Sequence, residues 1–158
     1  MTTACHDLWN FAAACYAQPG VEAACLELQQ AGADVCLILA AAWLERRGVQ
    51  PCEAHFEALR NVSQGWQSQA VMPLRTLRQH WKQSAASDPA LATLRRQIKQ
   101  LELDAEKVQL ERLQQASRSW PTGGETAHWL EPIYPDLPLP DAAIDRLRQA
   151  AAQLFAEG

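Results

Sequence analysis

The stretch GADVCLILAAAWLERRG, residues 32–48, constrains the fold most, because ten apolar residues stand in a row from Val35 to Leu44. A membrane-spanning helix needs about 20 apolar residues, so this run is too short to cross a bilayer. An aspartate precedes the run, and two arginines and a glycine end it, which is the pattern of a helix with matched ends. A helix that is apolar on every side has to be surrounded by other elements. We therefore predict a central helix over residues 33–47.

The rest of the chain carries the spacing of amphipathic helices and lacks the alternation typical of strands. Apolar residues recur three and four positions apart, and 48% of the 158 residues are apolar, enough for one sizeable core. We therefore predict an all-α fold, a compact bundle of about five to seven helices around the central helix. Asp7, Asp88 and Asp141 stand where they would cap helices. Further helices are expected over residues 21–30, from Pro51 to about Ser68, and from Pro73, which either kinks the preceding helix or starts a new one.

The segment from about residue 90 to residue 118 contains no helix breaker and predicts one long helix, about 43 Å in length. Its apolar side chains form two sets on different faces. The set expected to pack on the domain comprises Leu91, Leu94, Ile98, Leu101, Ala105 and Val108. The other set, Leu103, Leu110 and Leu113, needs a second cover: the C-terminal segment, a second subunit or another protein.

A change of character marks residues 119–140, which hold five prolines and two glycines and therefore no regular structure. The segment is also rich in large apolar side chains, among them Trp120, Trp129 and Ile133. We therefore expect an extended arm that packs on the body. The predicted organisation is a helical bundle domain over residues 1–118, the arm over 119–140 and a C-terminal helix over 141–158 that packs on the bundle.

Charge is distributed unevenly around a formal net charge of -4. Residues 61–100 hold six bases and one acid, whereas the segments before and after hold more acids than bases. Balance by acids of neighbouring helices is the commoner explanation of such a basic stretch. An acidic protein partner is the sharper alternative, and nucleic acid is a less favoured one. The basic candidates for partner binding are Arg75, Arg78 and Lys82 on one helical stripe, and Arg95, Arg96 and Lys99 after the next turn.

The motifs for metal or covalent chemistry are incomplete. Cys52-x-x-His55 has no second pair of zinc ligands, and Glu125-x-x-His128 lies in the Pro- and Gly-rich segment instead of on a bundle helix. No nucleophile motif and no Gly-rich phosphate loop occurs. We therefore predict no catalytic residue, no metal site and no cofactor.

The cysteines indicate a reducing compartment. Cys5, Cys15, Cys25, Cys36 and Cys52 are odd in number and form no Cys-x-x-Cys pair, so they are expected to be reduced thiols that act as small buried apolar residues. The first residues have neither the basic nor the apolar region of a signal peptide. We therefore expect a cytoplasmic protein with no membrane segment.

A pattern of aromatic and polar residues in the first half of the chain resembles an uncharacterised proteobacterial family of small helical proteins, a domain of unknown function. The pattern covers roughly residues 8–115, including Trp66 and the VMPLRTLR stretch around Pro73. In that family the position after Asp-Val is usually Asn, and here it is Cys36. The resemblance implies a helical bacterial cytoplasmic protein and brings no activity, cofactor or catalytic residue. The residues that carry it are Leu8, Trp9 and Phe11; Tyr16, Pro19, Gly20 and Val21; Gly32, Ala33, Asp34 and Val35; and Trp43, Leu44, Arg47 and Gly48.

Three functions remain open at this point. The first is a non-enzymatic interaction module, an adaptor or regulator that binds a protein partner or a second copy through Leu103, Leu110 and Leu113 and the basic stretch. The second is a small-molecule binder, or an enzyme of unfamiliar type, with a pocket at the central helix. The third is an anion or nucleic-acid binder that uses the basic region. The candidate pocket residues are Asp34, Cys36, Trp9, Tyr16 and Trp43.

Overall fold

The computed structural model describes residues 6–156, and every regular element in that range is helical, which confirms the all-α prediction. No helix in this range is long and apolar enough to cross a bilayer. The elements in chain order are α1 (Leu8–Tyr16), α2 (Val21–Gln30), α3 (Val35–Arg46), α4 (Glu53–Trp66), the π-helix η2 (Gln67–Val71), α5 (Met72–His80), α6 (Lys82–Ala85), α7 (Pro89–Ser117) and α8 (Asp141–Ala156).

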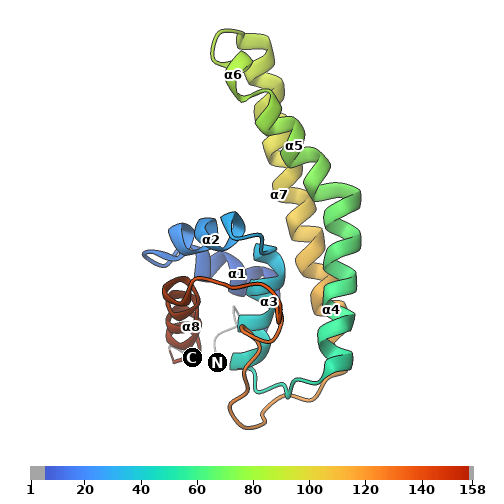
Figure 1. Cartoon of the computed structure of the whole chain (residues 1–158), viewed down its shortest axis with the longest axis vertical. Helices are drawn as coiled ribbons and strands as arrows, with labels where there is room; N and C mark the ends of the chain where they lie inside the picture. Colours follow the sequence, from blue (N-terminus) through green and yellow to red (C-terminus); the bar gives the residue numbers. More distant parts are fainter. Residues whose placement is uncertain (1–5, 157–158) are drawn as a thin grey trace.

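The molecule has a body and a projecting helical hairpin (Figure 1). α4, η2 and α5 follow one another without a break and run beside α7, with α6 at the far end of the hairpin. α1, α2, α3 and α8 form the body beside the α4 end of this hairpin. α3 contacts α4 and α7 of the hairpin and α1, α2 and α8 of the body, so it lies between the hairpin and the rest of the body.

α3 is the central helix that its apolar run predicts. All its residues from Cys36 to Glu45 are buried. Asp34 caps the helix by accepting a hydrogen bond of 3.0 Å from the Cys36 N–H. Gly48 follows the last turn at a φ of 70°, in the left-handed region that glycine adopts without strain.

The other predicted helix starts are confirmed or shifted by one or two residues. Asp7 and Asp88 both act as N-caps of their helices, α1 and α7. Pro51 was predicted as the first residue of the fourth helix, and this is wrong, because α4 begins at Glu53 with Cys52 at the N-cap. Asp141 is the first residue of α8 instead of the residue before it.

Pro73 stands in the first turn of a new helix, α5, which confirms one of the two predicted alternatives, and the π-helical segment η2 stands directly before it. A proline inside an α-helix removes one hydrogen bond and clashes with the carbonyl one turn earlier. Residues Gln67–Val71 adopt the wider π-helical turn, after which α5 continues with Pro73 in its first turn. π-helical turns change which way the following side chains point and are frequent at functional sites.

The long helix α7 buries parts of both predicted sets, Ala105 of the first and Leu110 and Leu113 of the second. Leu110 and Leu113 belong to the hydrophobic core, whereas Leu94 and Leu101 of the other set are about half exposed. The reason is that the C-terminal half of α7 contacts α1 and α3 as well as α4, while the N-terminal half is covered by α5 and α6 alone. The body of the same chain therefore buries Leu110 and Leu113, and no second subunit or partner is needed for this.

The segment over residues 119–140 packs on the body by its apolar side chains and by backbone contacts. Trp129, Leu130 and Ile133 have no exposed surface. The Trp129 indole N–H donates to the Val49 carbonyl at 2.7 Å, and the backbone N–H of Gly124 donates to the Gly48 carbonyl at 3.0 Å. These contacts fasten the segment to the C-terminal end of α3.

Three of the cysteines are buried thiols, as predicted: Cys15, Cys25 and Cys36. The prediction is wrong for Cys52, which is exposed at the start of α4. The N-cap position lies at the end of a surface helix, where a thiol remains in contact with water. Cys5 lies outside the residues that the structure describes.

Candidate functional site

The Asp34 carboxylate is the centre of a polar cluster where α3, η2 and α7 meet. Oδ1 accepts the capping bond from Cys36 and a second bond of 3.3 Å from the Gln67 side chain. Oδ2 accepts a bond of 2.5 Å from Gln109. The backbone N–H of Asp34 donates to the Tyr134 hydroxyl at 2.7 Å, which ties the arm to the cluster.

The two glutamine side chains that hold Asp34 also hold each other. Gln67 Nε2 donates to Gln109 Oε1 at 2.8 Å, and Gln109 Nε2 donates its second hydrogen to the Ser63 hydroxyl at 3.2 Å. Gln109 and Ser63 are buried, so the bonds replace those that water would give them. Gln67 is the first residue of the π-helix η2, and its place in that turn brings its side chain to Asp34.

Two arginines of α5 and two glutamates of α7 form an ionic group beside the cluster. Arg78 binds Glu102 through Nε at 2.9 Å and through Nη2 at 3.1 Å, a bidentate pair. Arg75 faces the same glutamate at 3.8 Å and Glu106 at 3.6 Å, which are ion-pair distances but too long for good hydrogen bonds. The group fixes α5 against α7.

Burial raises the pKa values of several titratable groups in and beside the cluster, and it raises the pKa of the Tyr134 hydroxyl to about 12. The pKa of the Asp34 carboxyl lies above its ordinary value because burial outweighs the hydrogen bond from Gln109. The pKa of Glu106 is raised by burial, and Arg75 only partly offsets this. Burial also raises the pKa of the Cys36 thiol well above its usual range, so this cysteine stays protonated and is a poor nucleophile.

Two clefts open on either side of this polar centre. The first, here called the Asp34 cleft, has a volume of about 510 Å³ and lies between α1, α2 and α3 on one side and α5 and α7 on the other. The second, here called the Tyr134 cleft, has a volume of about 570 Å³. It lies between Tyr134 of the arm, the start of α3, and the side of the hairpin formed by α4, η2 and α5. Asp34, Gln67 and Arg75 line both clefts. Ligand pockets in proteins have volumes of this size.

The Asp34 cleft has an apolar rim. Tyr16, Leu26 and Leu103 line it and are 44%, 55% and 46% exposed, so three large apolar side chains meet solvent around one cleft. Trp9 lies among them at the rim. The polar groups gather at the α5 end of the cleft, so its wall is apolar at one end and charged at the other. Exposed apolar groups of this kind, rimmed by polar residues, mark binding sites.

Four of the five residues predicted to line a pocket do so together. Trp9, Tyr16, Asp34 and Cys36 all line the Asp34 cleft. Trp43 lines neither cleft, and its prediction is wrong, because its ring is buried in the core with the Arg47 guanidinium 4.2 Å from its centre.

The apolar docking face predicted on α7 does not exist as one surface. Leu110 and Leu113 are buried by α1 and α3 and are not available to a partner, so the prediction is wrong for them. Leu103 is exposed, but it stands over the Asp34 cleft. The other large apolar residues of α7 that are exposed are Leu94 and Leu101.

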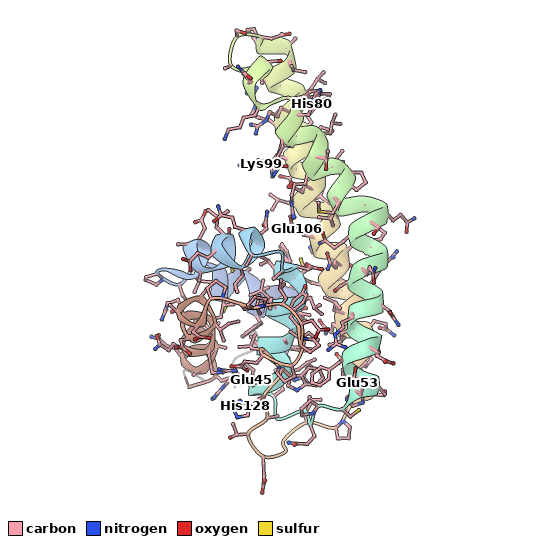
Figure 2. All side chains as sticks on the ribbon, viewed as in Figure 1. Glu45, Glu53, His80, Lys99, Glu106 and His128 are labelled. Atoms are coloured by element: carbon pink, nitrogen blue, oxygen red, sulfur yellow. The ribbon has the colours of Figure 1, made fainter. Side chains whose placement is uncertain are left out.

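The basic candidates separate into a paired and an exposed group. Arg75 and Arg78 are held by Glu102 and Glu106, as expected of charge balance between neighbouring helices. Arg95 donates to the Arg78 carbonyl at 2.8 Å. The exposed side chains are Arg96, which donates to the Thr93 hydroxyl, and Lys82 and Lys99 towards the end of the hairpin, where Figure 2 labels Lys99.

Sequence reasoning missed Gln67, Gln109, Glu102 and Glu106. One signal was available for three of them. Glu102, Glu106 and Gln109 recur at four and three positions on the predicted long helix, so they share one face, and that face also carries Ala105. A polar stripe beside a small residue in mid-helix indicates a packed polar contact. Gln67 had no local signal, because its direction depends on the π-helical turn.

A second cluster, at the C-terminal end of α3, contains possible metal ligands. One ligand atom each from Glu45, His128 and Glu131 lies within 4.8 Å of the others. Arg148 already occupies the two carboxylates, with Nε 2.6 Å from Glu45 and Nη2 2.8 Å from Glu131. A guanidinium therefore supplies the positive charge here, and Figure 2 shows Glu45 and His128 near the bottom of the body.

The N-terminal two thirds of the chain match a described family. Residues 7–113 fit the family model "Protein of unknown function (DUF2390)". The chain belongs to this family. The family is uncharacterised, in agreement with the resemblance found in the sequence. No curated protein and no solved structure matches the chain significantly. The matched range contains every lining residue of the Asp34 cleft, from Trp9 to Leu110, whereas Tyr134 and Arg148 lie beyond it.

Proposed function

We propose that this protein binds a small amphipathic molecule in the Asp34 cleft without transforming it. The observation that carries the proposal is the coincidence of a cleft of about 510 Å³ with three large apolar side chains, Tyr16, Leu26 and Leu103, left exposed around it. A solvent-exposed apolar rim is costly unless something covers it. The expected bacterial cytoplasmic setting is part of the proposal and is supported by the free thiols of Cys15, Cys25 and Cys36.

The polar side chains favour binding over catalysis. Asp34 is held by three hydrogen bonds and is not free to take up or release a substrate proton without breaking them. The Cys36 thiol is protonated and donates towards the Glu106 carbonyl at 3.8 Å. Groups arranged in this way give a rigid polar end to the cleft, which orients a ligand.

The proposal is tested with a neutral fluorescent probe, N-phenyl-1-naphthylamine, whose emission rises in apolar sites. We expect saturable binding with one site per chain. Ala13, an exposed residue of α1 that lines the cleft, supplies the blocking variant Ala13→Trp, which fills the cleft without touching the core. The matched control is Ala23→Trp, at an exposed position of α2 that does not line the cleft.

The blocking variant should lose at least about 90% of the probe's binding, and the control should keep it. Absence of saturable binding, or an Ala13→Trp variant that binds as well as the wild type, would contradict the proposal. Circular dichroism of both variants confirms that they fold. Mass spectrometry of an organic extract of the protein purified from its native host then identifies the natural ligand.

A second candidate is docking of an acidic protein on the projecting hairpin. Leu94 and Leu101, seven residues apart on α7, are about half exposed, and Lys82, Arg96 and Lys99 are exposed on the same hairpin. Apolar residues among positive charges fit an acidic partner with an apolar centre. This keeps the interaction module of the sequence analysis but moves it from Leu110 and Leu113 to the hairpin.

Light scattering after size exclusion tests this second candidate first. A monomer that captures an acidic protein, and a Leu94→Ser/Leu101→Ser variant that fails to capture it, would support docking. The control is Gln97→Ser on the same helix. A dimer that the double variant abolishes would assign the surface to a second copy. Binding to heparin that weakens steeply with salt would favour nucleic acid instead.

A further inference from the structure

We infer that the molecule held in the Asp34 cleft is an organic cation, with an amine or guanidine group at Glu106 and an apolar body against Trp9, Tyr16 and Leu103. This inference rests on the proposed function and names the class of ligand. It follows from the charges that line the cleft, from which of them are already paired, and from the position of the apolar rim relative to Glu106.

Acids outnumber bases in the wall of the cleft. The lining carboxylates are Glu22, Asp34, Glu102 and Glu106, and the lining bases are Arg75 and Arg78. A wall with this balance attracts cations and repels anions. An anionic ligand would have to reach Arg75 within the field of Glu102 and Glu106, which lie 3.8 Å and 3.6 Å from that guanidinium.

Glu106, together with the exposed Glu22 at the rim, is a lining carboxylate left to meet a ligand. Glu102 forms the bidentate pair with Arg78, and three hydrogen bonds occupy the oxygens of Asp34. The contact of Glu106 with Arg75, at 3.6 Å, is longer than a charged hydrogen bond, which normally measures about 2.8 Å. The side chain is partly exposed in the notch where the hairpin leaves the body (Figure 2). A ligand ammonium would give it the close partner that Arg75 does not.

The rim beside Glu106 suits a cation with an aromatic or aliphatic body. Leu103 precedes Glu106 by three residues, so the two side chains are neighbours on α7. Trp9 faces them from α1, and the Lys107 ammonium already lies 5.2 Å from the centre of its ring. This ring therefore already has a cation beside it, so a ligand would place its apolar body on Trp9 and its own cationic group at Glu106.

Three naphthalene compounds with the same apolar ring and a cationic, a neutral or an anionic side group test the inference: 1-naphthylmethylamine, 1-naphthalenemethanol and 1-naphthaleneacetate. Isothermal titration calorimetry at pH 7 and low salt should give the order amine, alcohol, acetate, with the amine about tenfold tighter than the alcohol. In Glu106→Gln the amine should bind only as tightly as the alcohol, and the alcohol should be unaffected. Glu111→Gln, an exposed position of α7 outside the cleft, is the matched control.

A second variant guards against a folding defect in the first. Glu22→Gln, at the exposed rim on α2, should lower the preference for the amine about two- to threefold. Tightest binding of the acetate, or an unchanged preference in both variants, overturns the cationic ligand. Equal binding of all three compounds also overturns it and leaves the proposed function standing. Failure of all three and of the neutral probe to bind overturns the proposed function itself.

Discussion

Gln109 of α7 donates a hydrogen bond of 2.5 Å to Asp34, the N-cap residue of α3, from a side chain that has no exposed surface. This bond joins the hairpin to the central helix at the point where the two clefts meet. It also fixes the direction of both glutamines, since Gln67 bonds to Asp34 and to Gln109. The floor of the candidate site is therefore a closed network in which each group depends on the others.

Replacement of Gln109 by methionine should lower the free energy of unfolding by about 2–3 kcal/mol. The apolar side chain has a similar volume, so the cost comes from the polar atoms of Asp34, Gln67 and Ser63 that lose a partner. Urea unfolding monitored by circular dichroism measures it. Gln97→Met, on the exposed part of the same helix, should change stability by less than about 0.5 kcal/mol, and an equal loss in both variants would refute the network's role.

Local pattern was sufficient to predict α3, its cap and its last turn. The signals there, an aspartate, a continuous apolar run and a glycine, act over less than twenty residues. The same holds for Asp88 and the long helix, whose bounds were predicted to within one residue. These features are set by backbone capping and burial, which a single helix expresses in its own residues.

The contents of the candidate site could be predicted only in part. Trp9, Tyr16, Asp34 and Cys36 were found because they surround the recognisable apolar helix. Gln109 was not, since its partner lies 75 residues away and only the packing of α7 on α3 brings the two together. Leu110 and Leu113 were assigned to a partner for the same reason. The apolar pattern of a helix predicts that one face is buried, but it does not identify the element that buries it.

Glu106→Gln should become more stable relative to the wild type as the pH rises above about 4.5, the ordinary pKa of this carboxyl. Burial raises the pKa of Glu106, so between its unfolded and folded values the folded chain binds more protons than the unfolded one. Stability contributed by this group is therefore lost as the pH increases. Glutamine does not titrate, so Glu106→Gln lacks the decrease in the free energy of unfolding with pH that Glu106 contributes.

Chemical unfolding of both proteins from pH 4 to pH 8 measures the difference. Comparison with Glu106→Gln cancels the opposite contribution of Glu131, whose pKa is lowered by Arg148. Glu111→Gln is the control and should run parallel to the wild type. A difference between Glu106→Gln and wild type that does not vary with pH would mean that Glu106 is well solvated in the folded protein.

Two glycine substitutions should change stability in opposite directions. Gly48→Ala meets a φ of 70°, and a Cβ there would lie 2.6 Å from the Gly124 carbonyl oxygen, so the contact between α3 and the arm has to open. We expect a loss of about 2 kcal/mol or more and faster proteolysis near residues 121–126. Gly65→Ala in α4 meets no atom within 4 Å and should gain up to about 1 kcal/mol through helix propensity.

Thermal unfolding and limited digestion with proteinase K, which needs no basic residue at the cleavage site, compare the two glycine variants directly. The expected signature is a lower Tm with early cleavage of the arm for Gly48→Ala, and a higher Tm with unchanged cleavage for Gly65→Ala. If Gly48→Ala kept the wild-type Tm, the close approach of Gly48 and Gly124 would not be needed for stability.

Removal of Arg148 should destabilise the protein through the glutamate that it leaves behind. Glu45 is almost fully buried and receives two bonds from Arg148, of 2.6 Å and 3.1 Å, as well as one from the Trp129 N–H. A buried charge without its partner costs about 3–5 kcal/mol, and the partial exposure of Arg148 reduces this to about 2 kcal/mol for Arg148→Met.

The double variant Arg148→Met/Glu45→Gln should recover part of that loss, because the amide has no charge to leave unpaired. Arg118→Met, at an exposed position, is the control and should be neutral within about 0.5 kcal/mol. Urea unfolding of the wild type, Arg148→Met, Glu45→Gln and the double variant gives the coupling free energy between Arg148 and Glu45. Additive effects of Arg148→Met and Glu45→Gln would mean that the ion pair contributes nothing. A coupling of about 1 kcal/mol or more would establish Arg148 as the cation that holds Glu45 at the end of the central helix.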